Sequence, residues 1–170
     1  MNSKQIIKRI PEEQTCKEIF KKIRDEKEVD CPKCGSSDHY WLKTREQYKC
    51  KNCGHRIPLR SGTLLHSTKL PFRYWFIGLD LVMDNDDHSL TELQKLLGHK
   101  YYSPIWKMVS KLRKALEYYR WDTESNTANK YEILTYPSVD EAAKQKKVAS
   151  GSKILGDVTK EELESQYFVI

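Results

Sequence analysis

Apolar side chains recur with the period of an amphipathic helix in four segments of the chain. The first segment follows Pro11, and its apolar positions share one face: Cys16, Ile19, Phe20 and Ile23. Proline is favoured in the first turn of a helix. The pattern therefore predicts a helix that begins near Pro11 and fades in the charged stretch 24–30. We expect it to pack on the following module with Cys16 buried.

Three further segments with helical period follow one another closely. The first covers 72–83 and has a wide apolar face. Ser89–Glu92 has the sequence of a capping box, which predicts a second helix that ends at Gly98. A third helix is expected to open near Ser103 and to continue through Leu116. Two helices joined by a short glycine-containing turn are typical of a helix-turn-helix, although a plain three-helix bundle has the same pattern.

Between the first two helices, the segments 39–42 and 47–49 read as short strands around a turn at 43–46. Two C-x-x-C pairs flank this ribbon with fifteen residues between them: Cys31, Cys34, Cys50 and Cys53. This spacing is typical of a four-thiolate zinc site, so we expect one structural Zn²⁺ per chain. The alternative, two disulfides, is disfavoured because the chain opens Met-Asn-Ser-Lys without an apolar signal segment.

The net charge of +6 is unevenly distributed. Residues 31–70 hold eight Lys or Arg against two Asp or Glu, and residues 99–120 hold six against one. Clustered positive charge favours nucleic acid as a partner, while two solvated faces are the alternative. The candidate phosphate-binding residues of the ribbon are Lys43, Arg45, Lys49, Lys51, Arg56 and Arg60.

The third predicted helix has the features of a recognition helix. Its first turn is polar and aromatic, and three lysines farther along share one face. The candidate DNA-binding residues there are Lys100, Tyr101, Tyr102, Ser103, Lys107, Lys111 and Lys114. We expect Trp106 to pack in the core, the usual place of a large aromatic side chain.

In order along the chain, these motifs resemble the N-terminal part of bacterial insertion-sequence transposases with a zinc ribbon. The resemblance covers about residues 5–120 and rests on CPKCGS, YKCKNCGHR, SGT, the Lys-Leu-Pro-aromatic run, Leu-Leu-Gly and Ile-Trp-Lys-Met. It implies that the four paired cysteines bind zinc and that Arg60–Thr63 joins the ribbon to the helices. It also implies that Gly98 forms the turn of the helix-turn-helix. In that family an RNase H-like catalytic domain follows, and about fifty residues after Leu116 are too few for one.

The expected fold is therefore mainly α with a small β zinc ribbon. We expect an N-terminal helix in 1–30, a four-cysteine zinc ribbon in 31–62 and a helix-turn-helix domain in 63–120. A linker and an acidic helical tail should occupy 121–170, where Ser138–Glu141 and Thr159–Glu162 have capping-box sequences.

The leading functional hypothesis is a zinc-dependent protein that binds double-stranded DNA and is not an enzyme, because no scaffold for catalytic carboxylates is evident. The alternative is an adaptor that uses the ribbon and the acidic tail to dock a separate protein. No apolar run is long enough to span a membrane. We expect a cytoplasmic, nucleoid-associated protein that could form oligomers.

Overall fold

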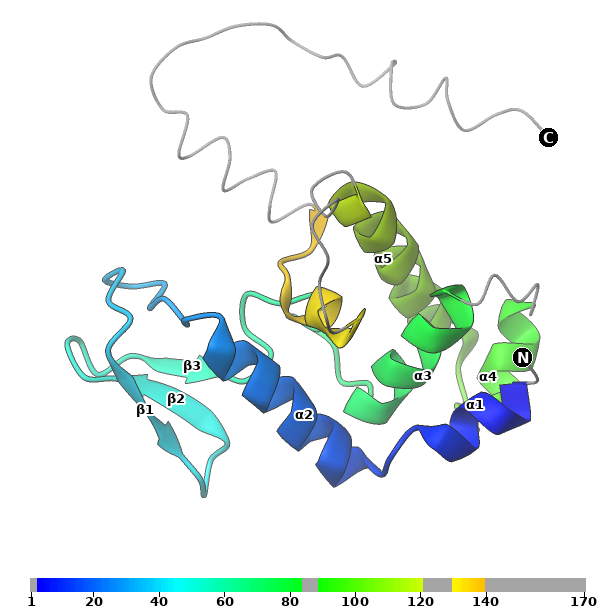
Figure 1. Ribbon diagram of the computed structural model, residues 1–170, viewed down its shortest axis with the longest axis horizontal. Helices are drawn as coiled ribbons and strands as arrows, with labels where there is room; N and C mark the ends of the chain where they lie inside the picture. Colours follow the sequence, from blue (N-terminus) through cyan, green and yellow to red (C-terminus); the bar gives the residue numbers. More distant parts are fainter. Residues whose placement is uncertain (1–2, 84–88, 121–129, 140–170) are drawn as a thin grey trace, which may run out of the picture.

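The computed structural model describes residues 3–83, 89–120 and 130–139. Helices dominate these ranges, and a small antiparallel sheet lies at one end (Figure 1). In chain order the elements are α1 (Ser3–Arg9), α2 (Glu13–Glu26), β1 (His39–Leu42), β2 (Gln47–Cys50), β3 (Arg56–Pro58), α3 (Phe72–Met83), α4 (Leu90–Leu96), α5 (Tyr102–Arg120) and the 3-10 helix η1 (Lys130–Thr135). The expectation of a mainly helical chain with a small β ribbon is confirmed.

The sheet has the strand order β1-β2-β3. β1 and β2 pair antiparallel around the turn at 43–46, as the sequence predicts. β3 adds a third antiparallel strand that the sequence did not predict. The register places Trp41, Tyr48 and Ile57 opposite one another, so they share one face of the sheet. Tyr48 and Ile57 are each only 2% exposed, which makes this the inner face.

The helices α3, α4 and α5 form the other end of the molecule around an apolar core. α3 spans the predicted range and is the most buried helix, with Trp75 and Leu79 fully inaccessible. A Cβ added to Gly78 would lie 3.0 Å from the terminal methyl of Met108 on α5. The missing side chain therefore permits close packing of α3 on α5.

The capping box predicted at the start of α4 is present. The Ser89 hydroxyl accepts a hydrogen bond from the backbone N–H of Glu92, and the Glu92 carboxylate accepts one from the backbone N–H of Ser89. α4 ends before Gly98, whose φ of +64° requires the left-handed conformation that glycine adopts easily. The Tyr74 hydroxyl of α3 donates to the carbonyl of Leu97 at 2.6 Å and fixes this turn to the core.

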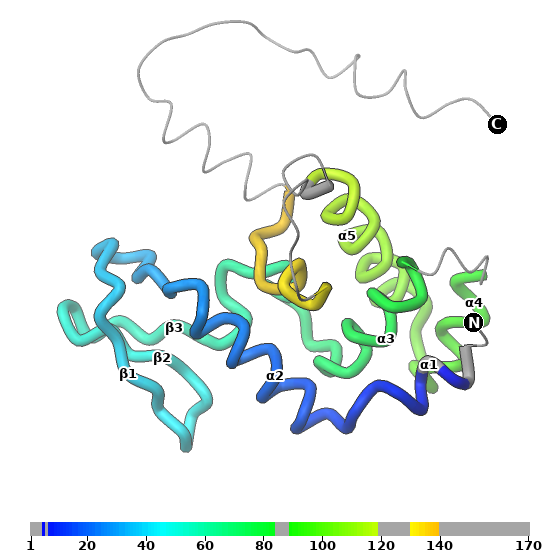
Figure 2. The backbone as a smooth tube through the Cα atoms, viewed as in Figure 1, coloured from blue at the N-terminus to red at the C-terminus, as the bar shows by residue number. Residues whose placement is uncertain are grey.

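α2 lies between the sheet and the other helices (Figure 2). It packs on α3 and η1, and its Asp25 side chain accepts a hydrogen bond from Tyr48 of β2. At its start, the Glu13 carboxylate accepts hydrogen bonds of 2.8 Å from the backbone N–H groups of Phe72 and Arg73, and so caps α3. At its end, the buried guanidinium of Arg24 donates to the carbonyls of Leu59 and Ser61. One helix therefore fixes both ends of the molecule.

Besides β3, two helical elements were missing from the sequence-based expectation. α1 precedes the helix predicted at Pro11, and Arg73 of α3 donates to the carbonyl of Ile7 in α1. η1 falls in the range expected to be linker and tail, but it packs on α2, α3 and α5 with Leu134 fully buried. The helices predicted from the capping boxes at 138–141 and 159–162 lie largely outside the described residues. Within the described ranges, no helix is long and apolar enough to cross a membrane.

Candidate metal centre and nucleic-acid interface

The two cysteine pairs occupy turns with nearly identical hydrogen bonding. The backbone N–H of Cys31 donates to the carbonyl of Ser36, and that of Cys50 donates to the carbonyl of His55. Each turn ends in a glycine whose N–H donates back to the first cysteine's carbonyl, at 2.8 Å for Gly35 and 3.0 Å for Gly54. Both glycines have φ near +70°, a left-handed conformation that glycine adopts easily.

These turns bring the four sulfurs together. The Sγ atoms of Cys31, Cys34, Cys50 and Cys53 all lie within 4.8 Å of one another. Two separations across the turns are 3.5 Å between Cys31 and Cys53 and 3.6 Å between Cys34 and Cys50. Four thiolates about 2.3 Å from a central Zn²⁺ would lie about 3.8 Å apart, so the cluster fits a tetrahedral zinc ion.

Backbone N–H groups favour the thiolate, the form that binds metal, at Cys31 and Cys50. At Cys53 the N–H of His55 acts in the same direction, but burial and hydrogen bonds with the other three thiols outweigh it and raise the pKa of that thiol to about 12. The N–H of Cys53 is the main group that lowers the pKa of the Cys50 thiol to about 7. Burial opposes ionisation of Cys31, but the N–H groups of Lys33 and Cys34 and the thiols of Cys53 and Cys34 together outweigh it and lower the pKa of that thiol as well. Cys34 is exposed, so one ligand lies at the surface.

The fifth cysteine has a different environment. Cys16 is fully buried in α2, and its thiol donates to the carbonyl of Pro11 at 3.4 Å. Burial is the main cause that raises the pKa of Cys16 to about 11. At neutral pH it therefore remains a protonated packing residue, as its apolar periodicity predicted.

Comparison with known proteins supports the assignment of the cysteine cluster. Residues 11–56 match the family model of the transposase zinc-ribbon domain. The match covers α2 and the cysteine turns, and the sulfur geometry of this part of the chain is consistent with a zinc ribbon. No curated protein and no solved structure matches the chain significantly.

The outer face of the zinc ribbon carries a short basic row. The register places Tyr40 opposite Lys49 and Lys49 opposite Arg56, so the three side chains share the face that points away from α2. Lys49 Nζ lies 5.9 Å from the centroid of the Tyr40 ring, and Tyr40 is 43% exposed. Only the unpredicted strand β3 brings Arg56 into this row.

The other basic residues predicted on the ribbon have different surroundings. Lys43 and Arg45 are exposed in the turn between β1 and β2. Lys51 is exposed and pairs with Asp38 at 2.7 Å. Arg60 is half-buried, and its Nη1 donates to the carbonyls of Thr68 and Leu70. Arg60 therefore holds the connection between ribbon and helices, which fits the joint role that the resemblance implied better than a phosphate contact.

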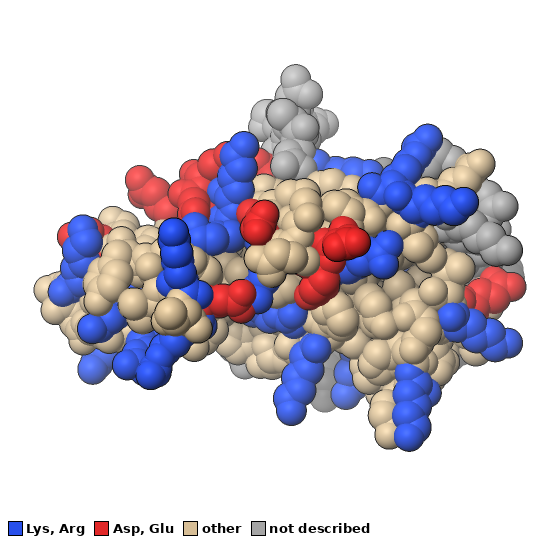
Figure 3. Space-filling model, turned by 90° about the horizontal axis from the view of Figure 1, so that it is seen from below, with Lys and Arg blue, Asp and Glu red and all other residues tan. Residues whose placement is uncertain are grey.

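Figure 3 shows Lys and Arg side chains around the ribbon end of the molecule, at the left. Asp and Glu lie over the upper left and the middle of this face, and further Lys and Arg side chains project from the helical end at the right. The positive charge on this face is therefore present at both ends of the molecule. This distribution agrees with the charge blocks in the sequence.

The exposed face of α5 differs from the prediction in one respect. Trp106 is 48% exposed, so the expectation that it packs in the core is wrong. Met108 and Val109, two and three residues later, take the inward positions beside Ile105 and Leu112. Trp106 lies one turn after Tyr102, itself 43% exposed, so the two rings share one face of the helix.

The predicted DNA-binding residues on and before α5 are mostly exposed. The exposed ones are Lys100, Tyr101, Tyr102, Ser103, Lys107 and Lys114. Lys111 is half-buried, and its Nζ donates to the carbonyl of His66 at 3.2 Å. Lys100 and Tyr101 precede the helix itself, which begins at Tyr102.

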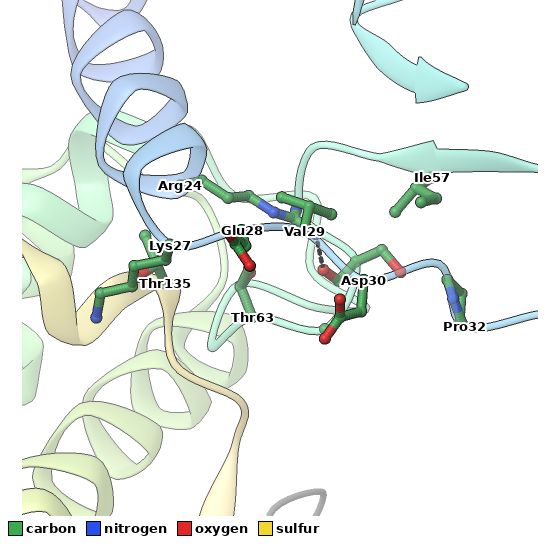
Figure 4. Close-up of a pocket in the computed structure, with 11 residues that line it drawn as sticks. Arg24, Lys27, Glu28, Val29, Asp30, Pro32, Ile57, Thr63 and Thr135 are labelled. Atoms are coloured by element: carbon green, nitrogen blue, oxygen red, sulfur yellow. Dashed lines mark hydrogen bonds between the residues drawn. The ribbon is translucent and has the colours of Figure 1, made fainter. Parts of the chain in front are cut away.

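A pocket of about 290 Å³ lies where the end of α2 meets β3 and the 61–63 loop (Figure 4). Its charged residues have both signs: Arg24, Lys27, Glu28 and Asp30. The Arg24 guanidinium donates hydrogen bonds to the loop carbonyls of Leu59 and Ser61. The Lys27 ammonium lies 3.5 Å from the centroid of the Tyr136 ring. These groups fasten the joint between the two ends of the molecule.

Proposed function

We propose that this chain binds double-stranded DNA through the outer face of the zinc ribbon and the exposed face of α5. The single observation that carries the proposal is the surface of α5, where exposed aromatic rings lie beside exposed lysines. An ordinary solvated helix face has no need for a 48% exposed Trp106. Aromatic and basic side chains together suit a polyanion that also presents bases.

In this proposal α4, its turn and α5 act as a helix-turn-helix. The turn is supported by the Gln94 side-chain amide, which donates to the carbonyls of His99 and Lys100 at 3.0 and 3.1 Å. The start of α5 would then enter the major groove with Tyr102 and Ser103, while Lys107 and Lys114 approach the backbone. Such a contact needs the N-terminal residues of the second helix exposed, and both are.

The zinc ribbon would raise the affinity for DNA without distinguishing one base sequence from another. The ion would be held by the four thiolates, a closed structural site in which the metal stabilises the fold without an open position for a substrate. Lys49 and Arg56 on the outer face, with Lys43 and Arg45 at the turn, would contact phosphates.

We also propose that the described part of the chain has no catalytic role. Two-metal phosphoryl transfer needs several carboxylates that converge on the ions. Among the described residues, the four cysteines are the only group of three or more His, Cys, Asp or Glu side chains placed to share a metal.

The test is a salt titration of duplex binding, measured by fluorescence anisotropy on the zinc-loaded protein. Replacing Lys107 and Lys114 with Ala should weaken binding to all sequences and reduce the slope of log K against log[salt] by about one per lysine. Lys49→Ala with Arg56→Ala should act similarly from the ribbon. A matched control replaces two exposed lysines outside both surfaces, Lys8 and Lys22.

An unchanged affinity and slope in both surface variants would overturn the proposal. Retention of random duplex only at very low salt would instead favour the adaptor hypothesis. Equal losses in the control and the surface variants would show that net charge, and not these two surfaces, determines binding.

A further inference from the structure

A groove beside the start of α5 has a composition unlike the rest of the surface. It has a volume of about 400 Å³ and lies between the 67–71 loop and the first turns of α5. Four apolar residues form much of its lining: Leu70, Pro71, Pro104 and Met108. Leu70 and Met108 also belong to the buried core, so this lining is anchored in the fold.

The side chains that line the groove and carry a full charge at neutral pH are all positive. Lys69, Lys107 and Lys111 line it, and no Asp or Glu is among its described lining residues. The Lys111 ammonium is positioned by its bond to the carbonyl of His66. The junction pocket at the end of α2, in contrast, contains both signs of charge.

The loop wall of the groove is fixed in place. Arg60 Nη1 donates to the carbonyl of Thr68 at 2.9 Å and to that of Leu70 at 2.7 Å. The Arg60 guanidinium also lies 4.2 Å from the centroid of the Phe72 ring, which anchors it to α3. A pre-formed wall lowers the cost of binding because little ordering is left to do.

An apolar lining whose charges are all positive suits a ligand in which a flat ring is attached to an anionic group. The volume lies within the usual range for small-ligand sites. We propose that the groove binds one nucleotide, with the base against the apolar lining and the phosphate among the three lysines. This inference rests on the proposed DNA-binding function and names a second contact within it, which shares Lys107 and Ser103 with the first.

The nucleotide that enters this groove must be unpaired. In a duplex both faces of a base are covered by its neighbours, so a base reaches a pocket only when it leaves the stack. Tyr101, which lines the groove, is 60% exposed, and Tyr102 and Trp106 follow on the adjacent helix face. Exposed rings of this kind stack on the faces of unpaired bases.

The test measures the binding of three DNA probes to the zinc-loaded full chain. The probes have the same length and the same backbone charge. One is fully paired, one carries a single unpaired adenine nucleotide, and one carries an abasic site in place of that nucleotide. We expect the unpaired nucleotide to tighten binding about ten-fold over the paired duplex, within the range that stacking of one base contributes. The abasic probe should lose this preference.

Two variants place the preference in the groove. Lys69→Met removes a groove lysine from an exposed loop position, and Lys114→Met removes an exposed lysine of α5 that does not line the groove. The first should reduce the preference for the unpaired nucleotide several-fold. The second should weaken all three probes alike. Equal preference in both variants would overturn the assignment to the groove.

Competition with free deoxyadenosine monophosphate distinguishes the source of the nucleotide. If millimolar nucleotide abolishes the preference, the groove also takes free nucleotides; if it does not, the groove needs the nucleotide within a strand. Equal affinity for the paired and unpaired probes would overturn this inference while leaving duplex binding intact. Failure to bind any probe would overturn the proposed function itself.

Discussion

The zinc ribbon, residues 31–58, and the helical module, residues 72–118, solve the same folding problem in different ways. The ribbon has three strands of three or four residues and few apolar side chains of its own. Its cysteine turns are defined by local hydrogen bonds between residues no more than five apart. The helical module instead buries a continuous set of large side chains, among them Trp75, Phe76 and Leu112.

This difference shows why α2 belongs to both regions. A module as small as the ribbon lacks a core, so it needs a metal and a packing surface. α2 provides that surface: the Tyr48 hydroxyl donates to Asp25 at 2.6 Å, and Lys21 Nζ lies 4.8 Å from the centroid of the Trp41 ring. The helical module uses the same helix at its other end through Glu13.

The largest expected effect comes from removing the metal site. Cys50→Ser should reduce zinc content from about one ion per chain to nearly none, since structural zinc contributes on the order of 10 kcal/mol to folding of such domains. Metal analysis and NMR amide spectra measure this. Only ribbon and neighbouring α2 signals should collapse. Loss of dispersion throughout α3 and α5 would show that the two regions fold as one unit.

Cys16→Ser is the matched control for the metal prediction. Cys16 is buried away from the cluster, so zinc content should stay at about one ion per chain. If Cys16→Ser lost the metal as completely as Cys50→Ser, the assignment of the four ligands would fail.

The next effect tests the apolar core with two tryptophans of the same module. Trp75→Ala should lower the free energy of unfolding by about 3–5 kcal/mol, because it leaves a large cavity in the core. Trp106→Ala should change it by less than about 0.5 kcal/mol, because the side chain is half exposed. Chemical denaturation followed by circular dichroism measures both, and zinc content should remain unchanged. Similar losses in the two variants would contradict the placement of Trp106.

A smaller effect is expected at the joint between the two regions. Arg24→Met keeps the apolar stem but removes the donors to Leu59 and Ser61, so the free energy of unfolding should fall by about 2 kcal/mol. The control Lys22→Met alters an exposed residue of the same helix. Thermal melting of both variants checks this. An Arg24→Met variant as stable as the control would show that the bonds from Arg24 to the 59–61 segment contribute little to stability.

The smallest effect concerns the cap of α3. Glu13→Ala removes the carboxylate that accepts from the N–H groups of Phe72 and Arg73, and should cost about 1 kcal/mol. Glu12→Ala, an exposed neighbour, is the control. Denaturation midpoints of the two variants provide the measurement. If both variants have the same denaturation midpoint, the long-range cap does not contribute to the free energy of unfolding.

Local patterns predicted much of this structure. The spacing of the cysteines, the capping box at Ser89 and the glycine at position 98 each depend on residues close in sequence, and each is confirmed. Long-range contacts were missed. β3 is too short to show a strand pattern, and η1 is stabilised by packing of Leu134 on helices more than a dozen residues away in sequence.

Spacing and periodicity were enough to predict the cysteine cluster and the main helices. These are local properties of the chain, so they can be read without knowing what packs against them. Three features emerged only from the folded chain: Trp106 is outside, Arg60 holds a loop, and three lysines from two segments surround an apolar groove. Those outcomes depend on which faces other elements cover, and no local pattern contains that information.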